Sequence, residues 1–386
     1  MNSNLKLCAV TGTNGKTTVT HILRDILSGE GYRCALVGTL GVNFTGEYIE
    51  TGYTTPPHEI FSEIVQKARE LDYDFLITEA SSHALDQERL AGFEFDIGIF
   101  TNFSHDHLDY HKTPDACAKA KSKLFRVCDH SVINYDDPRS AEMAWEAKDR
   151  VWYYSIGDPF ADFYAENIER SAQGISFDLC TGGAPERIRS SLYGDFSVYN
   201  MLAASSAASI LGVNRKAISK VIGDFRGVEG RMQRINPGDD FAVIVDFAHT
   251  PDAMKNVLTA AREFTAGRLI CVFGCGGGRD REKRPEMGAV AEKLADTAII
   301  TEDNSRDEMT SDIIGEIMQG IKNAGNVRVI ADRRDAIRAA TDFAQPGDTV
   351  MILGKGHEKY IHRGGEKIPF SDAEEIKRIL KERRKN

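Results

Sequence analysis

The stretch that decides the fold is CAVTGTNGKTT, residues 8–18. Its apolar start predicts a strand, and the glycines and lysine that follow predict a tight loop that leads into a helix. In such a loop the backbone N–H groups and the helix N-terminus face phosphate oxygens. The spacing departs from the common GxxxxGK[ST] pattern, because Val10 stands at the first glycine position. A turn that merely joins a strand to a helix is the alternative, and it explains less of the pattern.

ATP binding by this loop gives roles to its polar residues. We expect Lys16 to reach the β- and γ-phosphates and Thr17 to ligate Mg²⁺. The backbone and side chains around them would surround the phosphates. The expected ATP-binding residues of the loop are Gly12, Thr13, Asn14, Gly15, Lys16, Thr17 and Thr18.

Composition and charge limit the classes of protein. The 386 residues, 41% of them apolar, are enough for two or three cores of ordinary domain size. A net charge of −10, without a long block of lysine and arginine, disfavours nucleic acid as a partner. The seven cysteines are scattered without a CxxC pair, which is typical of reduced thiols. With neither a signal-like N-terminus nor an apolar run of about 20 residues, the sequence predicts a cytoplasmic protein with no membrane partner.

Short apolar runs alternate with helical patterns along the chain, which predicts an α/β fold with parallel sheets covered by helices. We expect a P-loop parallel-sheet ATPase domain at residues 1–229 and a second, Rossmann-like α/β domain at residues 230–386. Between them, the glycines, proline and charges of residues 224–240 interrupt the hydrophobic pattern. Residues 150–195 favour an antiparallel insertion in the first domain. The main predicted strands cover 5–12, 33–38, 74–80, 96–102 and 131–136, then 241–249, 268–274, 297–303, 327–333 and 349–356.

Polar residues follow two of the predicted strands, at the edge where parallel sheets bind ligands. Glu79 ends the first strand, and its carboxylate suits a metal ion. The stretch EASSHALDQER, residues 79–89, is equally consistent with a helix N-cap and a solvated helix face. After the second strand, residues 105–111 hold three histidines and two aspartates, which taken alone suggest Zn or Mn.

Eleven motifs in one order resemble those of the Mur ligases, and most of all the members that form a tripeptide. They are TGTNGKTT, TTPP, EASSH, TNFSHDHLDYH, AKSKLF, YGDFSVYN, GRM, VDFAHTPDA, VFGCGGGRDREKRPEMG, EDNSR and GKGHE. The resemblance implies an ATP-dependent ligase of peptidoglycan-precursor synthesis, in which an acceptor carboxylate is phosphorylated and the amine of an amino acid attacks the acyl phosphate. The domain at residues 230–386 would bind the incoming amino acid.

The resemblance implies a Mg²⁺ site in place of a transition-metal site. Lys121 lies on a predicted helix capped by Thr113, with Pro114 at its first position, and matches the lysine that family members carry as an N-carbamate. Carbamylation converts a cation into an anion whose oxygens Mg²⁺ can use. An unmodified lysine remains the alternative. The expected metal ligands are Thr17, Glu79, His107 and Lys121, and the expected catalytic residues are Lys16, Glu79, His107 and Lys121.

The resemblance also implies contacts for the nucleotide and the acceptor. Asn200 matches an adenine contact, Arg231 a phosphate contact and Asp246 a ribose contact. Five residues of the first domain match positions that hold the muramoyl and peptide end of the acceptor. These residues are Thr54, Thr55, Ser81, Gln87 and Arg89.

The C-terminal motifs imply the site of the incoming amino acid. Arginines bind a free carboxylate, and carboxylate and amide groups hold an ammonium. Arginine at position 306 resembles enzymes that add meso-diaminopimelate, although Ser305 replaces the motif's proline and removes a fixed φ. A dinucleotide-binding loop at residues 274–279 is a weaker interpretation, because it needs glycine where Arg279 stands. The matching residues are Arg284, Asp303, Asn304, Arg306, Gly354 and Glu358.

Family members carry a domain of roughly one hundred residues before the ATP loop, which binds the UDP of the acceptor. Only seven residues precede Cys8. We therefore expect an acceptor without UDP or a partner chain that supplies the UDP-binding domain. Two other functions stay open: a folate or poly-glutamate ligase, which the diamino-acid motif disfavours, and a non-catalytic partner of a full-length ligase, which the four expected catalytic residues disfavour.

Overall fold

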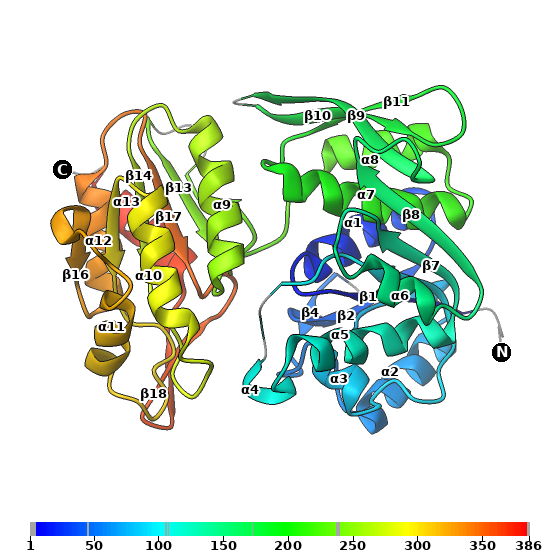
Figure 1. Ribbon diagram of the computed structural model, residues 1–386, viewed down its shortest axis with the longest axis horizontal. Helices are drawn as coiled ribbons and strands as arrows, with labels where there is room; N and C mark the ends of the chain where they lie inside the picture. The colour runs from blue at the N-terminus through cyan, green and yellow to red at the C-terminus, as the bar shows by residue number, and fades with distance from the viewer. Residues whose placement is uncertain are drawn as a thin grey trace. The chain divides into compact units, whose positions relative to one another are not determined.

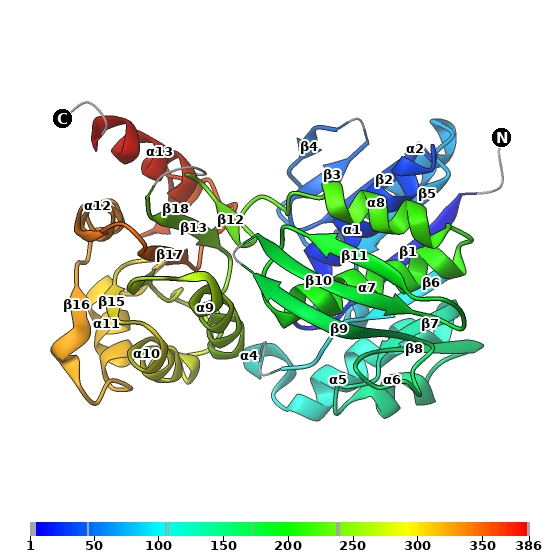
Figure 2. The same cartoon turned by 90° about the horizontal axis from the view of Figure 1, so that it is seen from above.

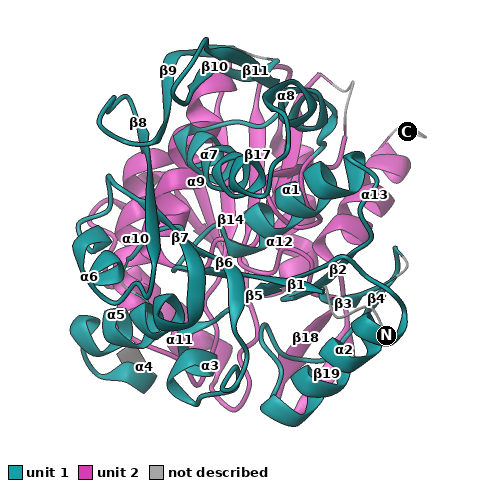
Figure 3. Cartoon of the chain, turned by 90° about the vertical axis from the view of Figure 1, so that its right-hand side faces the viewer, with its two compact units in different colours: residues 1–226 teal, residues 227–386 magenta. Residues whose placement is uncertain are grey.

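The protein is represented by a computed structural model that describes residues 5–44, 46–104, 106, 108–171, 173–236 and 240–383. His107, an expected metal ligand, lies outside the described residues. The chain separates into two compact units, Met1–Arg226 and Gly227–Asn386, which Figure 3 colours differently. The division falls in the glycine-rich segment where the sequence predicts a boundary near Gly230.

The first unit is built on one large mixed sheet (Figure 1). Its strands are β1 (Lys6–Thr11), β2 (Cys34–Gly38), β3 (Gly41–Asn43), β4 (Tyr48–Ile49), β5 (Phe75–Glu79), β6 (Phe95–Phe100), β7 (Cys128–Asn134), β8 (Arg150–Ile156), β9 (Phe163–Ser171), β10 (Gly174–Cys180) and β11 (Glu186–Ser190). Among the described residues they form an 11-stranded sheet in the order β11-β10-β9-β8-β7-β6-β1-β5-β2-β3-β4. The central strands β2, β5, β1, β6 and β7 pair in parallel, as the alternation of strands and helices predicts.

Helices cover both faces of this sheet. They are α1 (Lys16–Gly29), α2 (His58–Glu70), α3 (Ser82–Asp86), α4 (Leu108–His111), α5 (Pro114–Ser122), α6 (Ser140–Trp145), α7 (Asp195–Ile210) and α8 (Arg215–Asp224), with a 3-10 turn η1 (Lys123–Val127). Residues of α2, α3, α5 and α6 share one apolar core with the sheet, while α1, α7 and α8 lie together on the other face (Figures 1 and 2). The predicted cap of α5 is confirmed, since Ala116 N donates to Thr113 Oγ1 over 3.2 Å and Pro114 occupies the first helical position.

The antiparallel insertion predicted for residues 150–195 is wrong for its first strand. β8 pairs in parallel with both β7 and β9, and the antiparallel pairs of this segment are β9–β10 and β10–β11. All four strands extend the main sheet. The period-2 pattern of a strand reports which face is buried and carries no information about the direction of its neighbour, so the sequence could not separate the two arrangements.

The second unit has a smaller sheet with the strands β12 (Gln233–Arg234), β13 (Ala242–Asp246), β14 (Leu269–Phe273), β15 (Thr297–Ile300), β16 (Val327–Val329) and β17 (Thr349–Leu353). Its order in the described chain is β12-β13-β17-β14-β15-β16, and all pairs except β12–β13 are parallel. Its helices are α9 (Pro251–Phe264), α10 (Lys283–Leu294), α11 (Thr310–Met318), α12 (Arg333–Phe343) and α13 (Asp372–Arg383), with a 3-10 turn η2 (Ala324–Asn326). A separate hairpin is formed by β18 (Tyr360–Arg363) and β19 (Glu366–Pro369).

Both predicted domains are therefore α/β, a P-loop parallel-sheet domain followed by a Rossmann-like one. Strands such as β1, β13 and β17 are almost continuously buried, which is typical of parallel strands covered on both faces. The buried runs also place the polar residues that follow them at the carboxyl edge of each sheet, where open α/β sheets bind ligands. Within the described ranges, every helix is too short or too polar to cross a membrane.

Candidate functional site

The loop after β1 forms hydrogen bonds with Asn102, which follows β6, and with the side chain of Lys16. Asn102 accepts hydrogen bonds from two loop amides, Thr13 N at its carbonyl oxygen (2.8 Å) and Asn14 N at Oδ1 (2.9 Å). Lys16 Nζ donates to the carbonyl oxygens of Gly12 and Thr13, both over 2.9 Å. No side chain of the described residues caps the N-terminus of α1. The partial positive charge of that helix end therefore faces the loop, as phosphate binding requires.

Two glycines of the loop stand where a side chain would collide with a neighbour. Gly12 has a φ of 142°, and a Cβ there would lie 1.9 Å from Thr101 Oγ1. Gly15 has a φ of 89°, and a Cβ there would lie 2.3 Å from Asn200 Oδ1. Asn200, on α7 of the first unit, is thus held against the phosphate loop. Thr17 is buried and Thr18 is half-buried at the start of α1.

Glu79 ends β5 as a buried carboxylate, with only 1% of the residue exposed. Thr39, which follows β2, donates to both of its oxygens: N to Oε1 and Oγ1 to Oε2, each over 2.9 Å. Among the described residues no lysine, arginine or histidine forms an ion pair with Glu79, and no group of three or more His, Cys, Asp and Glu side chains is arranged to hold a metal ion. A buried carboxylate whose partners are all neutral has the chemistry of a divalent-cation ligand.

Lys121 is as deeply buried as Glu79, with 2% exposed, and its Nζ donates to Gly12 O over 3.1 Å. Burial lowers the pKa of this ammonium, and the charges of Cys117, Asp106 and Asp137 oppose that effect. Lys119, two residues earlier on α5, is exposed. Of the two, Lys121 is therefore the one whose amine reaches the phosphate loop.

The five residues expected to bind the acceptor are gathered beside Glu79. Thr55 connects three of them, because its Oγ1 donates to Glu79 O (2.7 Å), Ser81 N donates to that Oγ1 (3.0 Å) and Arg89 Nη1 donates to its carbonyl oxygen (2.7 Å). Gln87 Oε1 accepts from Arg89 Nε and Nη2 over 3.0 and 2.7 Å.

Two further contacts complete this group. The Thr54 hydroxyl lies 3.2 Å from that of Thr39. Ser81 also caps α3, accepting from Ala84 N over 3.2 Å. The helix N-cap that the sequence analysis gave as one interpretation of residues 79–89 is therefore present. Ser81 forms this cap and also lies beside Thr55.

Asp246 ends β13 with both carboxylate oxygens bonded to the main chain. Met232 N donates to Oδ2 and Ala248 N to Oδ1, each over 2.7 Å. Burial raises the pKa of Asp246, and the charge of Arg231 counteracts that shift. The Arg231 guanidinium lies over the ring of Phe247, 4.5 Å from its centroid. The predicted ribose and phosphate contacts therefore belong to one connected corner of the second unit.

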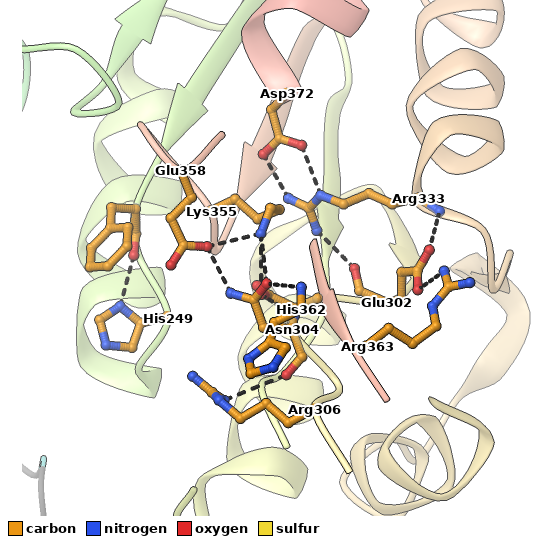
Figure 4. A network of polar contacts seen from close by, with 12 residues as sticks. His249, Glu302, Asn304, Arg306, Arg333, Lys355, Glu358, His362, Arg363 and Asp372 are labelled. Carbon is orange, nitrogen blue, oxygen red and sulfur yellow. Dashed lines mark hydrogen bonds and ion pairs between the residues drawn. The ribbon is translucent and has the colours of Figure 1, made fainter. Parts of the chain in front are cut away.

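The carboxyl edge of the second sheet holds a polar cluster drawn in Figure 4. Asn304 Nδ2 donates to Glu358 Oε2 over 2.8 Å, and Asn304 Oδ1 accepts from Lys355 Nζ over 3.1 Å. Lys355 Nζ also donates to Glu358 Oε2 over 2.8 Å. Asp303 Oδ1 is 3.9 Å from the same ammonium. A Cβ added to Gly354 would lie only 2.5 Å from Asp303 Oδ2.

The β18–β19 hairpin fixes the main chain of Arg306. Arg306 has a left-handed φ of 53°, its N donates to His362 O over 2.9 Å, and its O accepts from Gly364 N over 2.7 Å. Its Nη1 donates to Gly277 O over 2.5 Å. These hydrogen bonds hold the loop that the missing proline at position 305 would otherwise have stiffened.

Arg284 is held by two glutamates of the second unit. It is fully buried, and its guanidinium donates to Glu308 (2.9 and 3.0 Å), to Glu316 (2.8 Å) and to Gly276 O (3.1 Å). Arg279, by contrast, is exposed, and its charge contributes to lowering the pKa of Arg306. Arg279 therefore acts electrostatically on Arg306, and Arg284 bonds to the loop at Gly276. The amino-acid contact expected for Arg284 stays a prediction.

Sequence reasoning missed Thr39, Asn102, Arg279 and Lys355. Thr39 and Asn102 follow the strands β2 and β6, so the rule that drew attention to Glu79 also applied to them. Lys355 lies inside the quoted GKGHE motif, between two residues that were assigned. Only the fold shows that the Lys355 side chain turns inward and contacts Asn304 and Glu358.

Comparison with known proteins gives the family. The Mur ligase middle domain matches residues 10–208, and the Mur ligase, glutamate ligase domain matches residues 230–356. UDP-N-acetylmuramoyl-L-alanyl-D-glutamate–2,6-diaminopimelate ligase of Thermosynechococcus vestitus is 43% identical over 388 aligned residues, covering 99% of this chain and 78% of the relative. The enzyme of the same name from Caldanaerobacter subterraneus is 42% identical, covering 99% and 80%.

Solved structures agree. A structure of a ligase with the same name has a TM-score of 0.71 at 36% identity, covering 99% of this chain and 79% of the other. A folylpolyglutamate synthase of Mycobacterium tuberculosis has a TM-score of 0.73 at 16% identity, covering 92% and 88%, which shows the fold alone. On these matches and on the phosphate loop that opens the first unit, the chain belongs to the Mur ligases, the ATP-dependent, ADP-forming ligases that join an amino acid to a carboxylate.

Proposed function

We propose that this ligase joins meso-diaminopimelate to UDP-N-acetylmuramoyl-L-alanyl-D-glutamate, the reaction for which its relatives are named. The observation that carries the proposal is the polar cluster of the second unit. There, Asn304 and Glu358 lie side by side, and Arg306 projects from the loop that carries Asn304 (Figure 4).

The cluster suits an amino-acid head group. Glu358 Oε2 accepts two hydrogen bonds, while Oε1 accepts none from the residues that the structure describes and is available to an ammonium. Arg306 and Arg279 bring two positive charges together, and the pKa of Arg306 is lowered by burial first and by Arg279 next. A carboxylate between the two guanidiniums relieves that repulsion. Diaminopimelate carries two head groups of this kind, whereas lysine carries one.

The first unit supplies groups that fit ATP and Mg²⁺. Lys16, Thr17 and the N-terminus of α1 would hold the phosphates, and Asn200 would contact the adenine. Two residues of the second unit would add to these contacts, Arg231 to a phosphate and Asp246 to the ribose. Glu79, Lys121, Thr17 and His107 would hold the ion, whose charge neutralises phosphate oxygens during transfer. The neutral-partnered carboxylate of Glu79 supports this assignment.

We propose that Lys121 acts as a carbamate. The lowered pKa increases the fraction of neutral amine, which is the form that adds to CO₂. The product is an anion with two oxygens, and it would place an oxygen ligand at a position where the metal needs one.

In the reaction, the acceptor carboxylate attacks the γ-phosphorus and ADP leaves. The neutral amine then attacks the acyl carbon, phosphate leaves, and the nitrogen releases a proton. Thr54, Thr55, Ser81, Gln87 and Arg89 would orient the acceptor's peptide end beside Glu79. Glu358 and Asn304 would fix the amino acid so that one amine points toward the acyl carbon.

The experiment is a ligation assay that measures ADP and identifies the product by mass. We expect diaminopimelate to be preferred over lysine and over glutamate by at least about 10-fold in kcat/KM, since one charge-assisted hydrogen bond contributes about 1.5 to 3 kcal/mol. Arg306→Ala and Arg279→Ala should each reduce this preference, and the matched control Arg328→Ala, an exposed arginine on β16, should keep it. Equal use of lysine by the unaltered protein would refute the assignment.

Two earlier expectations stay predictions that the same assay can include. An acceptor without UDP is the alternative to the UDP-linked acceptor proposed above, and comparing UDP-linked and UDP-free muramoyl dipeptides decides between them. A partner chain that binds UDP stays a prediction. A preference for glutamate would instead support the poly-glutamate alternative. The cytoplasmic location also stays a prediction.

A further inference from the structure

We propose that Lys355 is a positioning residue that sets the orientation of Asn304 and of Glu358 for the incoming amino acid. The inference rests on the proposed function of the second unit and names the residue that organises its site. Lys355 itself does not reach a substrate, because its side chain is completely buried.

Lys355 is the common partner of three residues expected to bind the amino acid. Its Nζ donates to Asn304 Oδ1 (3.1 Å) and to Glu358 Oε2 (2.8 Å), and lies 3.9 Å from Asp303 Oδ1. Figure 4 shows the ammonium between Asn304 and Glu358. An ammonium has three N–H donors. Two of them are committed to residues of the site, and the third faces the Asp303 carboxylate.

The first consequence concerns the amide of Asn304. Its Oδ1 accepts from two donors, Lys355 Nζ and His362 N (2.8 Å), so a flipped amide would place N–H groups against N–H groups. The flip is therefore blocked, and Nδ2 points to Glu358. One Nδ2 hydrogen is used there, and the other donates to no described residue. Asn304 thus offers a donor beside the acceptor Oε1 of Glu358, which matches a carboxylate next to an ammonium.

The second consequence concerns the position of Glu358. Lys355 Nζ holds Glu358 Oε2 at 2.8 Å and is also an ion-pair partner of Asp303 at 3.9 Å. Without Lys355, Glu358 would lose a charge-assisted hydrogen bond and the cation that it shares with Asp303. Its carboxylate could then turn away, and the incoming ammonium would lose its partner.

The test uses the full chain with Lys355→Met, which keeps the length and removes the charge and donors. We expect KM for diaminopimelate to rise at least about 10-fold, with KM for ATP and for the acceptor changed less than about 2-fold. Lys359→Met, an exposed lysine of the same segment, is the matched control and should leave all three values unchanged. If Lys355→Met does not fold, Lys355→Gln, which keeps an N–H donor, takes its place.

A double-mutant cycle separates positioning from general support of the fold. If Lys355 acts through Glu358, the rise in KM caused by Lys355→Met together with Glu358→Gln is smaller than the product of the two separate effects. Effects that simply multiply, an unchanged KM for diaminopimelate, or an equal rise in all three KM values would each overturn the inference. A wild-type chain that does not ligate diaminopimelate contradicts the proposed function instead, so the two failures are distinguishable.

Discussion

At the scale of single residues, burial decides which of several similar side chains is chemically unusual. The helix α5 carries lysines at positions 119 and 121, and lysine as a residue type suggests solvated side chains at both. Lys121 is buried against the phosphate loop, however, and Lys119 is exposed. The sequence singled out Lys121 only through its family motif, because a residue's burial depends on the packing of the whole helix.

Replacing Lys121 with alanine should abolish phosphate release, because it removes the proposed oxygen ligand of Mg²⁺. Small carboxylates added to the assay should restore part of the activity by entering the space that is left. Lys119→Ala is the matched control and should retain full activity. Turnover of the Lys121→Ala variant at the parent rate would rule out the carbamate.

Ser305 has a buried hydroxyl, with 1% of the residue exposed, that no described atom bonds to. Ser305→Ala should therefore raise the free energy of unfolding by up to about 1 kcal/mol, since it removes an unsatisfied polar group. The preference for diaminopimelate should not change, because the β18–β19 hairpin holds the main chain of Arg306. Denaturant unfolding and the ligation assay check the two statements. A loss of preference in this variant would mean that the hydroxyl, and not the hairpin, aims Arg306.

At the scale of elements, the sequence predicts buried strands well and their partners poorly. Runs such as 74–80 and 349–356 became β5 and β17, because a continuous apolar run between turn residues has few alternatives. The direction of β8 and the inward turn of Lys355 depend on contacts between distant segments. The same limit applies to the ion pairs of Arg284, since its partner Glu308 lies 24 residues away along the chain.

The Arg284–Glu308 pair gives a pH-dependent prediction. Hydrogen bonds from Arg284 are the largest cause that lowers the pKa of Glu308 from 4.5 to about 2. Its stabilising contribution is therefore complete above pH 4.5 and is lost as the pH falls toward 2. Glu308→Gln should lower the free energy of unfolding by about 1 to 2 kcal/mol at pH 7, and by less at pH 3.

Chemical denaturation at the two pH values measures this difference. Glu366→Gln, at an exposed position of β19, is the control and should have no effect at either pH. If the Glu308→Gln difference were equal at pH 7 and pH 3, the ion pair would not be its source.

At the scale of the whole molecule, we propose that the two units bind different substrates of one reaction. The residues proposed for the phosphates, the metal and the acceptor lie mainly in the first unit, and those proposed for the amino acid lie in the second. Family, fold and motif positions could be predicted from the sequence, because each motif is local. The sequence could not predict which members of a motif face the substrate, since that depends on how strand ends meet at the edge of a sheet.

The measurement that tests the account most directly follows oxygen through the reaction. The acceptor is labelled with oxygen-18 in its reacting carboxylate and incubated with ATP and diaminopimelate. The account predicts that one labelled oxygen appears in each phosphate released, in equal amount to a product that contains diaminopimelate, because the acyl phosphate transfers that oxygen. Phosphate that carries no label, or label transfer without a diaminopimelate product, would contradict it.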